Sequence, residues 1–361
     1  MGLLFKEDWE ETKQHYLQWW NHEYFGRCAL AVVAPRRDAP AIPAPPDAVS
    51  PEQGWFDLDW ISKQMKYQLS RGFFGGEAFP VWNAGYSGVS SIPTFLGCPL
   101  DLDTETGWWR PILTDPERID YRGLKLNRQH PNYAFTMRML ERGVREAAGK
   151  SLVSIGAFGG CGDTLAGLRG TQQLLIDCIE RPEEVRAADL YLMDMWCEFY
   201  DECYAIIRDA CEGSTCWFDL WSPGRFYSAH NDFAYSIGPA MFREIFLPSI
   251  ERQVAFLDHC VYHVDGIGNF RHVQALCEIP KLQAYQIAPG AGKPSALHYM
   301  DTLKTVQQAG KNLWIYLPPA EIKDALSVLS ARGLFIVTNT QTEEEARALL
   351  RSVESWSVDR G

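Results

Sequence analysis

A histidine and an aspartate stand two residues apart at the end of a short apolar run, in the segment His263-Val264-Asp265-Gly266. In an extended strand, residues two apart share a face, so this imidazole and this carboxylate would lie side by side. The glycine indicates that the chain leaves the strand there, which is where α/β proteins place their chemistry. Such a pair can act as a general base and acid, bind a cation, or close the strand with a hydrogen bond.

The elements that would position this pair are short apolar strands alternating with helical patterns along most of the chain. Eight stretches have the length and composition of buried strands, namely residues 28–33, 78–83, 152–157, 215–220, 261–265, 282–288, 313–317 and 334–338. Eight such alternations predict an α/β protein, a (β/α)8 TIM barrel, with its site where the strands end. A doubly wound open sheet is the alternative, but no G-x-G-x-x-G phrase follows a strand and opens a helix.

The length of 361 residues suits a single barrel domain over residues 1–361, because barrels of about 250 residues commonly carry insertions. Residues 1–27 are expected to hold an amphipathic N-terminal helix, and the six prolines within residues 35–54 indicate a surface loop. Residues 84–150 are longer than one helix requires. They are expected to form an insertion after the second strand, as a lid or side structure.

Charge and hydropathy narrow the classes of partner. A formal net charge of -12, with no run of basic residues, makes nucleic acid and anionic membranes poor partners. No apolar stretch reaches the roughly 20 residues of a membrane span, and the chain begins with acids and tryptophans rather than a basic and then apolar leader. The ten cysteines are scattered, which indicates reduced thiols. We therefore expect a cytoplasmic protein that acts on a small molecule.

Polar side chains at the other strand ends would join the histidine and aspartate in a ring. Asp219 would end the fourth strand, so it joins His263 and Asp265 as a third candidate catalytic group, and the three could also serve as ligands of a cation. The residues expected to orient a substrate are Asn83, Tyr86, Trp221, Gln286, Tyr316 and Asn339.

Aromatic and glycine-rich segments near these ends have two interpretations each. The rings of Tyr86, Trp221, Phe226 and Tyr227 could stack on a planar substrate or belong to the core. The glycine segments at 266–268 and 290–293 lack the spacing of a phosphate-binding loop, so we interpret them as turns whose N–H groups could contact an anion.

Several helical phrases resemble the uroporphyrinogen decarboxylase superfamily. They are D-T-L-A-G-L-R-G at 163–170, L-L-I-D at 174–177, R-P-E-E-V at 181–185 and I-G-P-A-M-F-R-E-I-F-L-P at 237–248, which leads to H-V-D-G at 263–266. The resemblance extends over roughly residues 75–355. It implies a (β/α)8 barrel, in agreement with the strand count. It also implies either decarboxylation of tetrapyrrole acetate groups or corrinoid-linked methyl transfer.

This sequence departs from both activities at specific positions. Decarboxylases carry an N-terminal R-Q-A-G-R-Y phrase that is not reproduced near Arg27, and Asn83 stands where their second strand ends in a catalytic aspartate. The methyltransferases place a zinc site at H-x-C-G and take another cysteine from the last strand. Here Asp265 replaces the first thiolate, and residues 338–340 contain no cysteine.

The better match is a divergent branch nearer the methyltransferases. The resemblance implies methyl transfer between a small methylated substrate and a corrinoid or another one-carbon acceptor. A decarboxylase with a changed substrate and a non-catalytic corrinoid or tetrapyrrole carrier are the alternatives. No D-x-H-x-x-G phrase that would ligate a corrinoid occurs, so a corrinoid would arrive on a partner protein. Without sulfur ligands, tightly bound zinc is not expected, and His263 and Asp265 would at most hold an exchangeable cation.

Overall fold

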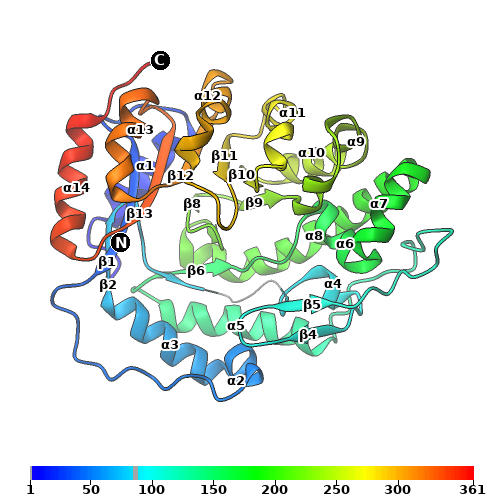
Figure 1. Ribbon diagram of the computed structural model, residues 1–361. Helices are drawn as coiled ribbons and strands as arrows, with labels where there is room; N and C mark the ends of the chain where they lie inside the picture. The colour runs from blue at the N-terminus through cyan, green and yellow to red at the C-terminus, as the bar shows by residue number, and fades with distance from the viewer. Residues whose placement is uncertain (1, 84–87) are drawn as a thin grey trace.

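A computed structural model describes residues 2–83 and 88–361. Its larger sheet has seven strands in the order β2-β1-β13-β12-β11-β10-β9, and all neighbours are parallel except β1 and β2 (Figure 1). These strands are β1 Ala29–Pro35, β2 Gly72–Gly76, β9 Phe226–His230, β10 His259–Asp265, β11 Ala284–Ala288, β12 Asn312–Tyr316 and β13 Leu334–Asn339. Parallel strands covered by helices on the outside explain why these segments are nearly continuous apolar runs.

A second sheet has the order β3-β6-β7-β8, formed by β3 Val81–Trp82, β6 Leu152–Ile155, β7 Ser214–Cys216 and β8 Trp221–Ser222. The first three are parallel, and β8 turns back along β7. The two sheets meet at Tyr227 of β9, whose hydroxyl donates to Gly156 O at 3.3 Å and accepts from Phe158 N at 2.9 Å. Because Gly156 and Phe158 follow β6, the segment after β6 packs against β9.

The architecture is therefore a mixed α/β one with a mostly parallel sheet. Each of the eight predicted strands overlaps an observed strand. Among the described residues, however, no ladder pairs β7 with β9 or β2 with β3, so the strands form two sheets rather than one hydrogen-bonded barrel. The antiparallel β2, which follows a helix and pairs with β1, was not predicted, because its sequence Gly-Phe-Phe-Gly-Gly is too rich in glycine to indicate a strand.

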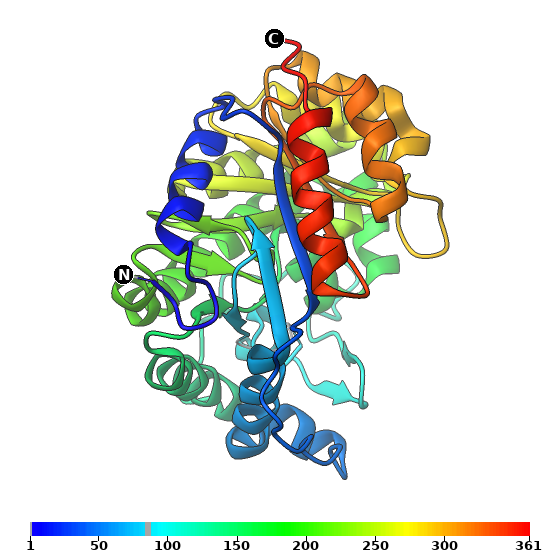
Figure 2. The same ribbon diagram turned by 90° about the vertical axis from the view of Figure 1, so that its left-hand side faces the viewer.

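Helices cover the outside of the sheets (Figure 1). They are α5 Pro131–Ala147, α6 Cys161–Arg169, α7 Thr171–Glu180, α8 Pro182–Cys211, α9 Pro239–Ile245, α10 Leu247–Phe256, α11 Val273–Cys277, α12 Met300–Gln308, α13 Ile322–Val328 and α14 Glu343–Trp356. Figure 2 shows α14 alongside β1. Its start is fixed by a capping box, in which Thr342 accepts from Glu345 N and Glu345 accepts from Thr342 N. No helix in the described ranges has both the length and the apolar character needed to cross a membrane.

The predicted N-terminal helix is α1, Trp9–Trp20, and it packs near the amino ends of the strands. The indole of Trp19 donates to Gly333 O, just before β13, at 3.0 Å. The indole of Trp20 donates to Trp221 O at 2.9 Å. The aromatic side chains that make the sequence of this helix conspicuous therefore belong to the core.

The proline-rich segment is irregular from residue 36 to Ser50, and two helices follow it, α2 Pro51–Phe56 and α3 Leu58–Arg71. The insertion after β3 contains α4 Ile92–Phe95, the hairpin of β4 Leu100–Leu102 and β5 Gly107–Trp109, and then α5. Residues 84–87 at the start of this insertion lie outside the described residues.

The predicted strand at 215–220 is wrong in its second half. The strand β7 ends at Cys216, and Asp219 has a φ of 46°, in the left-handed region that an extended strand cannot use. The amide of Asp219 donates to Cys216 O at 3.0 Å, which closes the turn into β8. The next parallel strand of the larger sheet is β9, which the sequence analysis did not identify.

Candidate functional site

The imidazole of His263 lies in a row of polar residues across three parallel strands. In the β10 register His263 is opposite His230 of β9 and Gln286 of β11. Residues opposite one another in register and on the same face are neighbours, so the sheet places these three side chains together. The predicted grouping of His263 with Gln286 is therefore observed, and His230 is an addition.

His263 is held in one orientation. Its Nδ1 hydrogen bonds the Oε1 of Gln286, and since an amide oxygen only accepts, Nδ1 is the donor. Its Nε2 then carries the lone pair of the neutral ring. The rings of Trp217 and Phe218 stand edge-on to it, at centroid distances of 5.4 and 5.7 Å. Burial, with the nearby His230, lowers the pKa of His263 to about 4, so the ring is neutral at pH 7 and can accept a proton or bind a cation.

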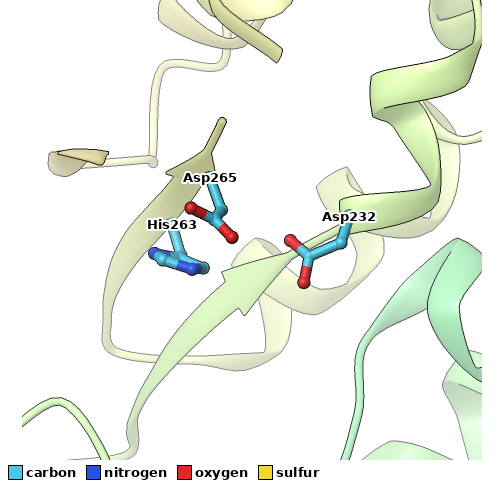
Figure 3. A group of neighbouring side chains, drawn as sticks. All are labelled: Asp232, His263 and Asp265. Atoms are coloured by element: carbon cyan, nitrogen blue, oxygen red, sulfur yellow. The ribbon is translucent and has the colours of Figure 1, made fainter. Parts of the chain in front are cut away.

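Two carboxylates face this ring. Asp265 lies two residues beyond His263 on β10, and Asp232 begins the short 3-10 helix Asp232–Ser236 that follows β9. Figure 3 shows the two carboxylates pointing toward each other, one from the end of β10 and one from the segment that follows β9. One ligand atom from each of these three residues lies within 4.8 Å of the others. Loss of hydration raises the pKa of Asp232, and the charge of Asp265 adds to this while His230 opposes it.

Asp163 positions the segment that carries Asp232. Its carboxylate accepts from Asp232 N at 2.9 Å and from Phe233 N at 2.8 Å, and its Oδ2 lies 3.8 Å from His230 Nε2. The turn before α6 approaches β9 closely, and a Cβ at Gly160 would lie 2.5 Å from His230 O. Only glycine fits at this position, which explains Gly160.

Two cavities adjoin this cluster. One, of about 330 Å³, is lined by His263, Asp232, His230, Asp163, Trp217 and by Pro93 and Trp109 of the insertion. The other, of about 480 Å³, is lined by Asp265, Gln286, Tyr316 and the loop after β11, which includes Lys293. Because His263 and Asp232 line the first and Asp265 lines the second, the cluster lies between them.

Two of the predicted substrate-binding residues, Asn339 and Asn83, lie elsewhere. Asn339 is exposed at the end of β13 opposite Val33, and neither of the two cavities includes it. Asn83 is exposed after β3 and lines a separate cavity of about 460 Å³ beside α3 and α5. Tyr86 lies outside the described residues.

Trp221 and Asp219 lie toward the N-terminal helix. Trp221 is buried against Trp9 and Tyr16, so the structure does not bring it to His263. Asp219, in the β7–β8 turn, has a pKa raised to about 7 by loss of hydration, and its charge acts on Tyr16. The same turn carries Trp217 and Phe218, whose rings do contact His263.

The aromatic residues Phe226 and Tyr227, considered for stacking on a substrate, are completely buried. They are core residues, as the alternative interpretation stated. The segment from Gly156 to Asp163 was expected among the strand ends, and the residues that sequence reasoning missed are His230, Asp232 and Trp217. A signal for the first two exists, because His230-Asn231-Asp232 repeats the spacing of His263-Val264-Asp265 after an apolar strand.

Together, the fold and the site define an α/β protein whose polar cluster lies at the carboxyl ends of parallel strands. No protein-family model matches the chain, and no curated protein matches it. Among solved structures it is similar to a methyltransferase from Methanosarcina mazei, with a TM-score of 0.61 and 11% sequence identity, over 95% of this chain and 98% of that one. The two proteins thus share a fold over nearly their whole lengths.

Proposed function

We propose that this chain is a cytoplasmic methyltransferase with a (β/α)8 barrel, from a divergent branch of the uroporphyrinogen decarboxylase superfamily. The shared fold with a methyltransferase supports this proposal, as do the helical phrases of the sequence. The observation that carries it is the cluster of His263, Asp232 and Asp265 between two cavities. Methyl transfer needs a donor and an acceptor that approach the methyl carbon from opposite sides, and two cavities that adjoin one cluster suit that geometry.

The charge of the cluster favours a cationic methyl donor. At neutral pH His263 is neutral, so it carries no positive charge to offset the carboxyl groups of Asp232 and Asp265. Trp217 and Trp109 line the cavity next to Asp232, and aromatic rings attract onium groups. We propose a small quaternary ammonium or sulfonium donor. The acceptor attacks the methyl carbon, the carbon–nitrogen or carbon–sulfur bond breaks, and the leaving atom keeps the electron pair and becomes neutral.

Each residue then has a stated role. Asp232 and Asp265 hold the cationic donor, and Nε2 of His263 takes the proton from an acceptor that carries one. Gln286 fixes the tautomer of His263, and Tyr316 lines the acceptor side. Asp219 assists through the turn that places Trp217 and Phe218 against His263 rather than by touching the substrate. The acceptor is a corrinoid on a partner protein or another one-carbon acceptor.

The related methyltransferases are expected to hold zinc, and the cluster fits a cation in part. Two atoms bound to one ion at roughly 2.0–2.4 Å lie at most about 4.8 Å apart, and the three ligand atoms lie within that distance of one another. The donors are two carboxylates and an imidazole, without sulfur. We therefore propose that a divalent cation binds weakly and exchanges, with Asp232, His263 and Asp265 as its ligands, and that zinc is not retained tightly. A bound cation would occupy the carboxylates that hold the onium donor, so it would compete with the donor for Asp232 and Asp265.

The test is methylation of a free corrinoid. The protein is incubated anaerobically with cob(I)alamin and tetramethylammonium or trimethylsulfonium, and formation of methylcob(III)alamin is followed by its absorbance. We expect a rate above the enzyme-free blank with at least one onium donor. The variants His263→Ala and Asp265→Asn should lower that rate on the order of 100-fold. His298→Ala, at an exposed histidine outside both cavities, is the matched control.

Two results would refute the proposal. The first is no methyl transfer from either donor above the blank. The second is an unchanged rate in His263→Ala while the variant remains folded by circular dichroism.

A further inference from the structure

A cavity of about 620 Å³ lies away from the candidate site, beneath α3 and the end of α5. It shares no lining residue with the two cavities at His263. Its floor includes Trp82 of β3 and Ser151, which directly precedes β6. It therefore opens near the amino end of β6, whereas the candidate site lies at the carboxyl ends of the strands.

Three of the residues that line this cavity carry a buried polar atom without a hydrogen-bond partner in the described residues. The atoms are Ser62 Oγ, Trp82 Nε1 and Ser151 Oγ. The side chains are 7%, 2% and 4% exposed, so all three are more than nine-tenths buried. Burying a polar group without a partner is unfavourable, and such groups call for an explanation such as a ligand.

The indole of Trp82 is fixed in place by α5. A Cβ at Gly143 would lie 2.7 Å from a carbon of the Trp82 ring, so the glycine lets the ring pack directly on the helix backbone. An indole N–H can only donate. A ligand that satisfies it must therefore present an acceptor, such as a carbonyl or ether oxygen, inside the cavity.

Most of the remaining wall is apolar. Leu4, Phe5, Ile42 and Leu69 line it, and the volume lies in the range of small-molecule sites. Walls of this kind offer few partners to a cluster of water molecules. They suit an apolar body that carries one or two oxygen atoms.

The rim is basic in a chain whose formal net charge is -12. Lys63, Lys66 and Lys150 are exposed around the opening, and Arg142 lies beside them. Arg142 is paired with Glu146 and, at 3.0 Å, with Asp59, the two acids of the rim. Four basic against two acidic side chains leave the opening positive, so it attracts an anionic head group.

From these observations we infer that this cavity is a second ligand site that binds an amphipathic organic carboxylate. The apolar body, with an acceptor oxygen, lies against Trp82, Ser62 and Ser151, and the carboxylate faces the lysines of the rim. The inference does not depend on the proposed methyl transfer, because none of these residues belongs to the His263 cluster.

The test uses 4-benzoylbenzoate, which has a carboxylate, two apolar rings and a ketone oxygen that also cross-links on irradiation. The binding of this probe to the full chain is measured by isothermal titration calorimetry, and the cross-linked residues are mapped by peptide mass spectrometry. We expect cross-links to peptides that contain Trp82, Leu69 or Phe5. The analogue 4-benzylbenzoate lacks the ketone, and the methyl ester of the probe lacks the charge, so both should bind more weakly.

Two variants separate the contacts. Trp82→Phe keeps a ring but removes the N–H, so it should weaken the ketone probe about fivefold while changing 4-benzylbenzoate less than about twofold. Reversing both rim charges, in Lys63→Glu with Lys66→Glu, should weaken the probe at least tenfold, whereas Lys304→Glu on exposed α12 should not. The inference is overturned if the probe does not bind at about 1 mM, if cross-links map to the His263 cavities, or if Trp82→Phe weakens both ligands equally.

Discussion

The strongest quantitative prediction concerns the proton affinity of His263 and the stability of the fold. Burial beside His230 lowers its pKa from 6.5 to about 4. An unfolded chain therefore binds a proton at this histidine in a pH range where the folded protein does not. Stability attributable to His263 is full above pH 6.5 and is lost as the pH falls toward 4.

The size of the effect follows from the shift. The full shift corresponds to about 3 kcal/mol, of which about 2 kcal/mol is lost between pH 7.5 and pH 5. The variant His263→Asn cannot bind this proton, so its free energy of unfolding should fall by about 2 kcal/mol less than that of the wild type over that interval. Urea unfolding followed by tryptophan fluorescence at both pH values measures this difference.

The matched control is His298→Asn, which replaces an exposed histidine and should follow the wild type at both pH values. His259 also has a pKa lowered to about 4, but it is present in all three proteins, so its contribution cancels. If His263→Asn loses as much stability as the wild type between pH 7.5 and 5, His263 titrates normally and the assignment of a neutral, cation-accepting imidazole is wrong.

Three further predictions concern other groups. Electron paramagnetic resonance should show weak, exchangeable binding of Mn²⁺, which Asp232→Asn weakens at least tenfold and the control Asp324→Asn, at an exposed residue, does not weaken. Zinc that stays bound in stoichiometric amount when the protein is purified with a chelator would contradict this prediction. Gly143→Ala forces a Cβ against the Trp82 ring, so the free energy of unfolding measured in urea should fall by about 1 to 3 kcal/mol despite the better helix propensity of alanine. A gain in stability would contradict the close packing of Trp82 on α5. Glu77→Gln should lower the free energy of unfolding by about 3 to 5 kcal/mol, because it leaves Arg27 without its buried carboxylate. Since the pKa of Glu77 is lowered to about 2, the contribution of this carboxylate should persist down to pH 4.5 and fade below it. A loss of stability in Glu77→Gln that is as large at pH 3 as at pH 7 would refute this prediction.

The sequence predicted where strands exist better than where they end or how they pair. Runs such as residues 334–338 and 261–265 are apolar, bounded by turn residues and covered by helices, so their assignment required no tertiary information. The run at 215–220 looks similar, yet the chain turns at Asp219 because the β7–β8 hairpin packs its tryptophan against α1. That contact links residues about 200 positions apart, and no local pattern encodes it.

The site was predicted in part for the same reason. His263 and Asp265 share a face by strand periodicity, and Gln286 joins them because neighbouring parallel strands are in register at that point. The third member, Asp232, depends on a strand that the sequence analysis did not identify and on Asp163, whose carboxylate holds two backbone amides of the Asp232 segment. A residue positioned by another element's side chain cannot be located from its own neighbours in the sequence.

The electrostatics of the cluster links its chemistry to its structure. A histidine that is neutral at pH 7 cannot balance the two carboxylates that face it, so the site gains free energy from any cation that enters. A methyl donor with an onium charge and an exchangeable divalent cation would therefore compete for Asp232 and Asp265. Competition of this kind distinguishes the proposed function from a purely structural cluster, because Mn²⁺ should then raise the KM for the onium donor without changing kcat, in the wild type and in the His298→Ala control alike.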